Sequence, residues 1–173
     1  MFYRRKIVFA LLEKFKEGLE STRLQKLMFL LTQMQKEPDY EFMPYRFGCY
    51  SYSLKADLVA MVKHNWLVTA EKSYTLNINK NYYKELKASD QELVNETFEL
   101  YGKMNTEVIT KHTYLNFPYY ATKSVIAEKI LPEKFFEKAL SARAIEESTV
   151  LFTIGYQGIS LEEYLNRLIR SDF

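Results

Sequence analysis

Residues 51–78 read SYSLKADLVAMVKHNWLVTAEKSYTLNI, and their pattern says most about the fold. The apolar residues of the first half lie three or four positions apart, which is typical of one face of an amphipathic helix. These residues are Leu54, Leu58, Met61 and Val62. The second half is richer in β-branched and aromatic residues, so it predicts two short strands over 66–69 and 73–78. We therefore expect a helix over 53–64 that leads into a β-hairpin.

Two further helices are predicted before this helix and hairpin. Residues 6–17 and the stretch between Thr22 and Pro38 each carry an apolar stripe, and Thr22 with Gln25 forms a predicted capping box. Residues 40–52, YEFMPYRFGCYSY, break the helical period. Three helices followed by a hairpin are the element order of a winged helix. We therefore expect a mainly α chain of the α+β class with a winged-helix-like domain.

The second half of the chain predicts more helices and one late strand. Ser89 is a predicted N-cap, and a helix around residues 108–115 places His112 on its apolar stripe. Residues 149–154, TVLFTI, are rich in β-branched and aromatic side chains, so they predict a strand. Ser160 is expected to cap a last helix. A strand and a helix at this end indicate the opening of an α/β domain whose body is missing.

These elements divide the chain into three predicted parts. Residues 1–80 are the winged-helix-like domain, residues 81–148 are a helical extension, and residues 149–173 are the start of a truncated α/β domain. A strand followed by a helix usually continues to a second parallel strand, which this sequence does not contain. We therefore expect that removal of residues 149–173 leaves the melting temperature of residues 1–148 nearly unchanged.

The composition fits a chain that can form an ordinary hydrophobic core. Its 173 residues are 47% hydrophobic and 27% charged, and no run of eighteen apolar residues predicts a membrane span. The first residues predict an amphipathic helix rather than a signal peptide, so we expect a cytoplasmic location and no membrane partner. A single cysteine, Cys49, excludes an internal disulfide framework and a multi-thiolate zinc site. The net charge of +2 falls short of the strongly basic balance of a dedicated nucleic-acid binder.

Most of the chain resembles a known winged-helix family. Residues 24–27 (LQKL), residues 48–51 (GCYS) and residues 116–124 (NFPYYATKS) are similar to segments of the YwgA-like group. The resemblance covers roughly residues 1–130, and Cys49 stands where that group usually has a proline. It implies a winged-helix fold and brings no settled activity with it.

The last residues resemble a second family. Residues 153–156 (TIGY), followed by Ser160 and Glu162, are similar to the opening of the domain of unknown function number 488, over about residues 150–173. That family continues with an Asp-Val-Arg strand, which is absent here. The resemblance therefore implies a truncated domain, and the chemistry of the full domain cannot be placed on these residues.

A nucleic-acid surface is the first candidate site. In a winged helix the third helix enters the major groove, while the wing and the flanking helix ends contact phosphates. The candidate phosphate contacts are Arg23, Lys26, Arg46, Lys55, Lys63 and Lys72. The predicted helix over 53–64 offers no Arg, Asn or Gln for a bidentate base contact, and Asp57 would repel a phosphate. These charges also fit the solvated face of a wing that binds protein, and both alternatives remain open.

Other residues offer further candidates. The aromatic residues of 40–52, with Arg46 among them, could stack on bases, although such clusters more often form core. A glycine turn ahead of the last helix could bind an anion at the helix N-terminus, although the acidic first turn of that helix disfavours this. The residues of this candidate anion site are Gly155, Gly158 and Ser160. No catalytic constellation, cofactor motif or metal-ligand pattern is recognised, since spacing ties neither histidine to Cys49.

Three hypotheses for function follow from these patterns. The first is a non-enzymatic winged-helix module that acts as a regulator by binding double-stranded DNA or a protein partner. The second is the N-terminal targeting part of a longer enzyme, whose active site lies in the missing C-terminal domain. The third is an interaction module that forms homodimers through its aromatic surface.

Overall fold

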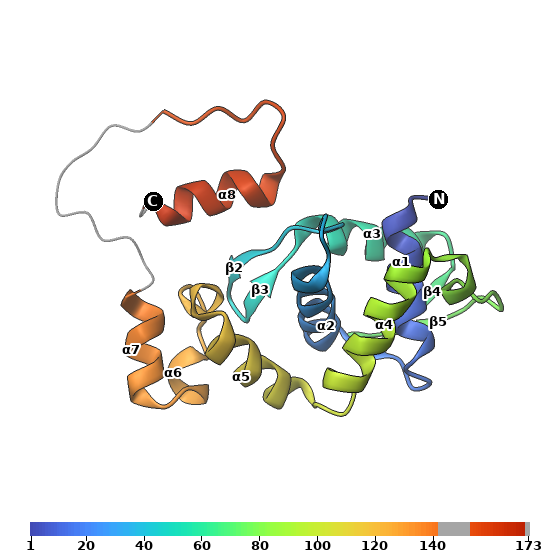
Figure 1. Cartoon of the computed structure of the whole chain (residues 1–173), viewed down its shortest axis with the longest axis horizontal. Coiled ribbons are helices and arrows are strands. Elements are labelled where there is room, and N and C mark those ends of the chain that lie inside the picture. The colour runs from blue at the N-terminus through green and yellow to red at the C-terminus, as the bar shows by residue number, and fades with distance from the viewer. Residues whose placement is uncertain (142–152, 172–173) are drawn as a thin grey trace. The chain divides into compact units, whose positions relative to one another are not determined.

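The structure of the protein is a computed structural model that describes residues 1–141 and 153–171 (Figure 1). It is mainly helical with two small antiparallel sheets, which confirms the predicted α+β class. The chain forms two compact units. Unit 1 comprises Met1–Tyr40 and Ser53–Ile109, and unit 2 comprises Glu41–Tyr52 and Thr110–Phe173. The boundary expected at residue 80 therefore falls inside unit 1.

Unit 1 is built from four helices and a three-stranded sheet. Its helices are α1 (Tyr3–Glu13), α2 (Ser21–Met34), α3 (Tyr52–Lys63) and α4 (Ala88–Tyr101), with the short 3-10 helix η1 (Tyr83–Glu85) before α4. Its strands are β1 (Leu19–Glu20), β4 (Leu67–Ala70) and β5 (Ser73–Leu76). The helix and the hairpin predicted over 53–78 are thus present, with bounds shifted by one or two residues.

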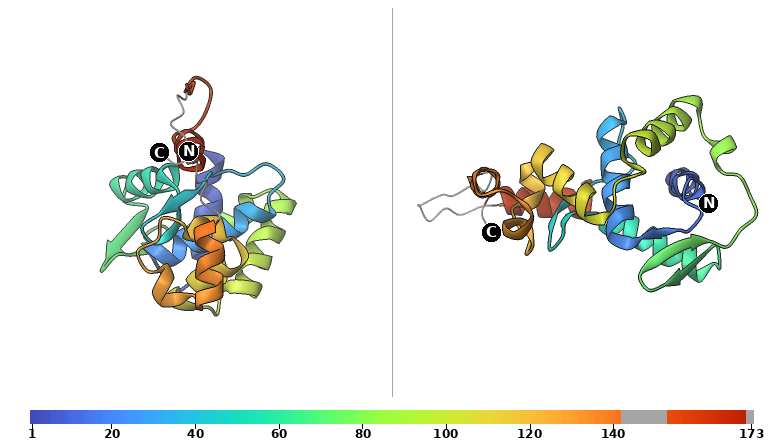
Figure 2. Two further views of the ribbon diagram at one scale, coloured as in Figure 1. Left: turned by 90° about the vertical axis from the view of Figure 1, so that its left-hand side faces the viewer. Right: turned by 90° about the horizontal axis from the view of Figure 1, so that it is seen from below.

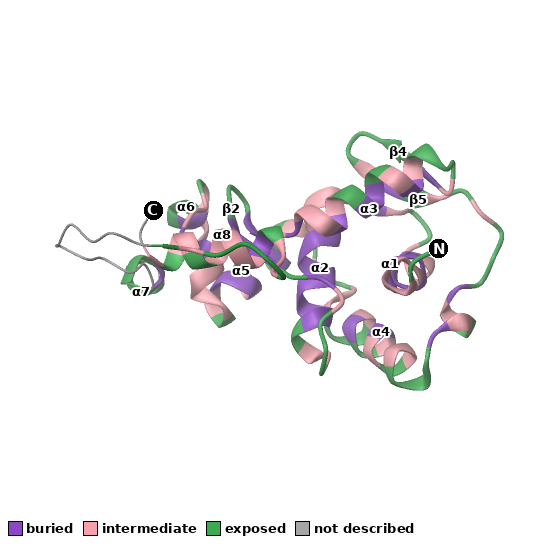
Figure 3. Ribbon diagram, turned by 90° about the horizontal axis from the view of Figure 1, so that it is seen from above, coloured by how far each residue is buried: buried purple, intermediate pink, exposed green. Residues whose placement is uncertain are grey.

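Helices α1 and α2 supply the core of unit 1. All six residues from Ile7 to Leu12 are buried, and so are all nine from Leu24 to Thr32. Helix α1 packs against α4 and β5, as the end-on view in Figure 2 shows, and α2 is mostly buried in Figure 3. A helix enclosed on all sides needs apolar residues around its circumference rather than along one stripe. Each large side chain buried here contributes about 1.5–3 kcal/mol.

The sheet of unit 1 has the order β1-β5-β4, with both pairs antiparallel. Leu19 pairs with Tyr74, and Leu67 pairs with Leu76. Gly18 allows β1 to approach β5, because its φ is +80° and a Cβ atom there would lie 2.5 Å from the Tyr74 carbonyl oxygen. The short strand β1 was not predicted, yet it joins the connection between α1 and α2 to the hairpin.

Unit 2 combines a hairpin with short helices. The hairpin consists of β2 (Met43–Tyr45) and β3 (Gly48–Tyr50). The helices are α5 (Thr106–Asn116, whose first residues belong to unit 1), η2 (Pro118–Ala121), α6 (Ala127–Ile130), α7 (Glu133–Ser141) and α8 (Leu161–Arg170). A cluster around Tyr114, Ala127 and Leu131 forms part of the buried core. The predicted strand over 149–154 lies largely outside the described residues, and Thr153 and Ile154 adopt no regular structure.

The helix ends confirm some capping predictions and contradict others. The Ser160 hydroxyl accepts the Glu163 backbone N–H at 2.9 Å and caps α8, and Gly102 is the C-cap of α4. The capping boxes expected at Thr22 and Ser89 are wrong. The N-caps of α2 and α4 are Glu20 and Lys87, each two residues before the predicted one, and neither makes a side-chain capping bond.

Helix α5 turns a different face inward from the one that was expected. Val108 is exposed and His112 is half-buried, whereas Ile109, Thr113 and Tyr114 are buried. The apolar stripe that was expected to include His112 is therefore not the face that is buried. The hydroxyl of the buried Thr113 can hydrogen-bond to a backbone carbonyl within the helix. A polar residue can therefore occupy a core position that a search for apolar periodicity does not find.

Candidate functional site

Helix α3 and the β4–β5 hairpin form the candidate functional site of unit 1. The buried residues of α3 are Leu54, Asp57, Leu58 and Met61. The opposite side of the helix and the hairpin expose Ala56, Val59, Lys63, Val68 and Lys72, which we call the α3–hairpin surface. Val59 is 54% exposed and Val68 is 47% exposed, so two β-branched apolar side chains lie in solvent.

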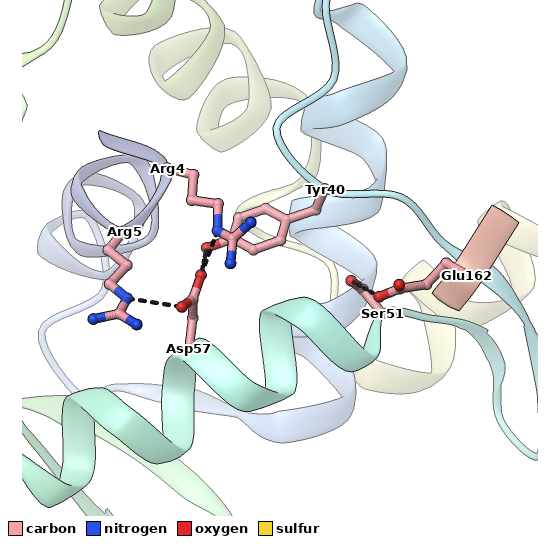
Figure 4. A network of polar contacts seen from close by, with 6 residues as sticks. All are labelled: Arg4, Arg5, Tyr40, Ser51, Asp57 and Glu162. Carbon is pink, nitrogen blue, oxygen red and sulfur yellow. Dashed lines mark hydrogen bonds and ion pairs between the residues drawn. The ribbon is translucent and has the colours of Figure 1, made fainter. Parts of the chain in front are cut away.

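Asp57 holds the buried side of α3 in place. Its Oδ2 accepts the Arg4 Nε at 2.6 Å and the Tyr40 hydroxyl at 3.0 Å, and its Oδ1 accepts the Arg5 Nε at 2.7 Å (Figure 4). Sequence reasoning placed Asp57 on the exposed face, where it would repel phosphate. That prediction is wrong, because two arginines from α1 neutralise a carboxylate that is only 2% exposed.

The ionisation of this cluster follows from its contacts. Burial alone would raise the pKa of Asp57, but the hydrogen bonds from Arg4, Arg5 and Tyr40 outweigh it and hold that pKa below its ordinary value. Burial raises the pKa of the Tyr40 phenol, and the neighbouring Asp57 carboxylate raises it further. The cluster therefore contains an ionised carboxylate and a neutral tyrosine at neutral pH. Its chemistry is that of a structural anchor rather than a proton-transfer site.

A tight turn joins α3 to the hairpin. Asn65 adopts a φ of +59°, a left-handed conformation that asparagine tolerates better than most residues. Its carbonyl oxygen accepts the Asn77 side-chain amide at 3.0 Å. Trp66 is half-buried, stacks on His64 with 4.6 Å between ring centroids, and contacts Phe9 edge-on. These contacts position the hairpin against the end of α3.

Two of the predicted phosphate contacts are used inside unit 1. Lys26 is 1% exposed within α2, so the prediction that it contacts phosphate is wrong. The Arg23 Nη2 donates to the Gly102 carbonyl oxygen at 2.6 Å, and its guanidinium lies over the Phe15 ring. Burial lowers the pKa of Arg23. This arginine ties α2 to the end of α4.

Three other predicted cations belong to α3 and the hairpin. Lys63 and Lys72 are exposed, and Lys72 sits in the β4–β5 turn with a φ of +70°. Lys55 is half-buried, and its Nζ donates to the Tyr74 hydroxyl at 2.9 Å. The turn also contains the exposed Glu71. The α3–hairpin surface is therefore only weakly cationic.

Arg46, the remaining predicted cation, belongs to unit 2 and is exposed at the turn of the β2–β3 hairpin. The side chains of Tyr45, Tyr50 and Tyr52 contact one another there, with ring centroids 5.0–6.0 Å apart. Burial raises the pKa of the Tyr52 phenol. Cys49 is buried in the same hairpin. The structure therefore assigns the aromatic segment partly to core and partly to an exposed hairpin turn.

The predicted anion site lies at the start of α8 and faces carboxylates. Gly158 has a φ of +76°, and the Ser160 hydroxyl donates to the Glu41 carboxylate besides capping the helix. Glu162 is 2% exposed, and its Oε1 accepts the Ser51 hydroxyl at 3.1 Å. These carboxylates disfavour a bound anion. Sequence reasoning missed the Ser51–Glu162 and Glu41–Ser160 contacts, because their partners lie more than a hundred residues apart.

Two further findings concern metal binding and membrane spanning. In residues 1–141 and 153–171, no group of three or more His, Cys, Asp or Glu side chains is arranged to hold a metal ion. None of the helices in the described part of the chain has both the length and the apolar character needed to cross a membrane. Comparison of the sequence with family models and with curated proteins gives no match.

Proposed function

We propose that the chain is a non-enzymatic binding module in which unit 1 is a winged-helix-like domain. The element order α1, β1, α2, α3, β4, β5 and the sheet order β1-β5-β4 support this proposal. In it α3 is the recognition helix and the β4–β5 hairpin is the wing. The β2–β3 hairpin lies between α2 and α3, where a helix-turn-helix usually has a turn of a few residues.

We infer that the partner of the α3–hairpin surface is a protein. The exposed apolar residue Val59 carries this inference, because it lies between Ala56 and Lys63 on one face of α3. Base readout in the major groove depends on Arg, Lys, Asn or Gln side chains with donors in fixed positions. The centres of protein interfaces are instead apolar and depleted in charge. A small apolar face with lysines at its edges fits a complementary, mildly acidic protein segment.

Double-stranded DNA is the second candidate. Lys63 and Lys72 are exposed at the end of α3 and at the hairpin turn, where winged-helix proteins place phosphate contacts. Phosphate contacts of this kind position a protein on DNA without reading its sequence. The two candidates therefore predict different effects of salt concentration, and of substituting Lys63 and Lys72, on binding.

One pair of experiments separates the candidates. A photo-crosslinking phenylalanine analogue at position 59 should capture a discrete protein in cells, whereas the same analogue at the exposed Val108 should not. In parallel, the full chain is titrated into random duplex DNA at two salt concentrations. Equal crosslinking at positions 59 and 108 would contradict the protein proposal.

Lysine variants test the DNA candidate further. If DNA is the ligand, Lys63→Ala with Lys72→Ala should weaken binding to all sequences and lower the salt slope by about one per lost phosphate contact. Lys103→Ala is the matched control, since Lys103 is exposed in unit 1 outside the α3–hairpin surface. Salt-dependent binding that falls in the double variant but not in the control would favour DNA over a protein partner.

A further inference from the structure

We propose that unit 2 contains a docking site for a helix, that its ligand is α8 of the same chain, and that α8 docks reversibly and folds as it docks. The site consists of Glu41, Phe42, Ser51 and Tyr119, which we call the α8 site. This inference is independent of the partner of the α3–hairpin surface. It concerns the residues that sequence analysis assigns to a truncated domain.

Directional polar contacts hold α8 on the α8 site. The Asn166 side chain donates to the Phe42 carbonyl oxygen at 2.8 Å and accepts the Tyr119 hydroxyl at 2.9 Å. Glu162, one turn earlier on the same face, accepts the Ser51 hydroxyl (Figure 4). Arg170 adds a cation–π contact, with its guanidinium 5.0 Å from the Tyr119 ring centroid. The contacts thus run along the whole length of the helix.

The apolar side of α8 is incompletely covered. Leu161 is 54% exposed, and Tyr164, Leu165, Leu168 and Ile169 are only half-buried. Glu162 is the only residue of this ten-residue helix that is fully buried. The hydrophobic stabilisation of α8 is therefore smaller than that of α1, in which six consecutive residues are buried.

Because α8 is short, its helical conformation depends on docking. Isolated helices shorter than about 12–15 residues are marginal in water. Released from the α8 site, α8 would retain its Ser160 cap and the Glu163–Arg167 pair, and together these are too weak to hold a helix of this length. Helix formation and docking are consequently one equilibrium.

The contacts also define which helices the α8 site accepts. A ligand needs a serine at the N-cap, an acidic residue two positions later and an asparagine four positions after that, as in Ser160, Glu162 and Asn166. A helix that lacks the asparagine would leave the Phe42 carbonyl and the Tyr119 hydroxyl without these bonds. Loss of bonds to these partly buried polar groups costs free energy that the matching helix does not lose, so the pattern discriminates.

Amide hydrogen exchange in the full chain tests reversible docking directly. The α8 amides should exchange at least tenfold faster than those of α2, through openings that leave unit 1 protected. Asn166→Ala should accelerate exchange in α8 by at least a further fivefold. Arg167→Ala, on the exposed side of the same helix, is the matched control and should change exchange little. Protection of α8 equal to that of α2 would overturn reversible docking.

A peptide in trans tests recognition. A labelled peptide of residues 153–171 should bind the full-length Asn166→Ala chain at least fivefold more tightly than the wild-type chain, because its competing α8 is weakened. The same peptide carrying Asn166→Ala should not bind. Equal affinity for both chains, or no binding to the variant whose other amides remain protected, would overturn the α8 site.

Discussion

Asp57 shows how one buried carboxylate can organise unit 1. Its three donors come from α1 and from Tyr40, near the end of the first segment of that unit. Removing a charge from water is costly, and the hydrogen bonds compensate for that cost only when all the partners are in place. The cluster therefore fixes which side of α3 is buried, and with it the residues that form the α3–hairpin surface.

Asp57→Asn should lower the free energy of unfolding by about 2–3 kcal/mol, because it leaves Arg5 without its charged partner and weakens the bond to Arg4. The loss should stay below that of a fully enclosed ion pair, since the Arg4 side chain is 37% exposed. Urea denaturation measures the difference. Glu71→Gln, in the exposed hairpin turn, is the control and should change stability by less than about 0.5 kcal/mol. Equal effects of the two substitutions would contradict the anchoring role.

The pH dependence of that difference has a defined sign. The folded pKa of Asp57 lies below its unfolded value of about 3.9, so the folded state favours the ionised form. The resulting stabilisation is complete above the unfolded value and disappears as pH falls through the folded pKa. We expect the stability gap between wild type and Asp57→Asn to be constant from pH 7 to about 5 and to shrink below about pH 4. A gap that widens on acidification would refute this assignment.

At the scale of elements, the pairing of the shortest strand depends on the identity of a single residue, Gly18. Strand β1 has two residues, and it pairs with β5 only because the chain comes close at Gly18. A side chain there would need a left-handed backbone and would meet both the Tyr74 carbonyl oxygen and the Thr75 hydroxyl. The connection between α1 and α2 is thereby joined to the hairpin that follows α3.

Gly18→Ala should therefore destabilise the protein by about 1–3 kcal/mol, through backbone strain and displacement of β5. Gly155→Ala is the matched control, because a Cβ atom there meets nothing within 4 Å. Thermal unfolding of the two variants beside the wild type measures the effect. If Gly18→Ala unfolds at the wild-type temperature, the close approach of β1 to β5 is not required.

The sequence predicted where helices and strands form better than it predicted which side of each helix is buried. The helix and hairpin over 53–78 were found because their periods differ and their turn residues are polar. Asp57 was placed outward because an apolar-stripe argument assigns carboxylates to solvent, and the burial of Glu162 was not predicted. Both are buried by partners distant in sequence, Arg4 and Ser51 among them, and local periodicity carries no information about such partners. Strand β1 is too short to have a period at all.

At the scale of the whole molecule, the last residues belong to unit 2 rather than forming an orphan fragment. Residues 161–170 are helical as expected, but they contact Phe42, Ser51 and Tyr119 of the same unit. The sequence resemblance to the start of an α/β domain gave no reason to expect these contacts. These contacts argue against the expectation that removal of residues 149–173 leaves the melting temperature nearly unchanged.

We now expect deletion of residues 153–173 to lower the melting temperature by a few degrees, because it removes the bonds to Phe42, Ser51 and Tyr119. Differential scanning calorimetry of the shortened and full chains measures the shift. The loss of amide protection should be largest in unit 2. An unchanged melting temperature would show that these residues do not stabilise the rest of the chain.

The division of the chain also has a consequence during synthesis. The chain passes from unit 1 to unit 2 after Tyr40, returns after Tyr52 and leaves again after Ile109. The β2–β3 hairpin, with its buried Met43 and Cys49 and with the buried Phe42 just before it, therefore leaves the ribosome well before the helices of its own unit. At about 5–20 residues per second, it waits for several seconds with an apolar surface uncovered. Nascent-chain chaperones that bind exposed apolar segments would meet this hairpin during that interval, and the order of translation sets how long the interval lasts.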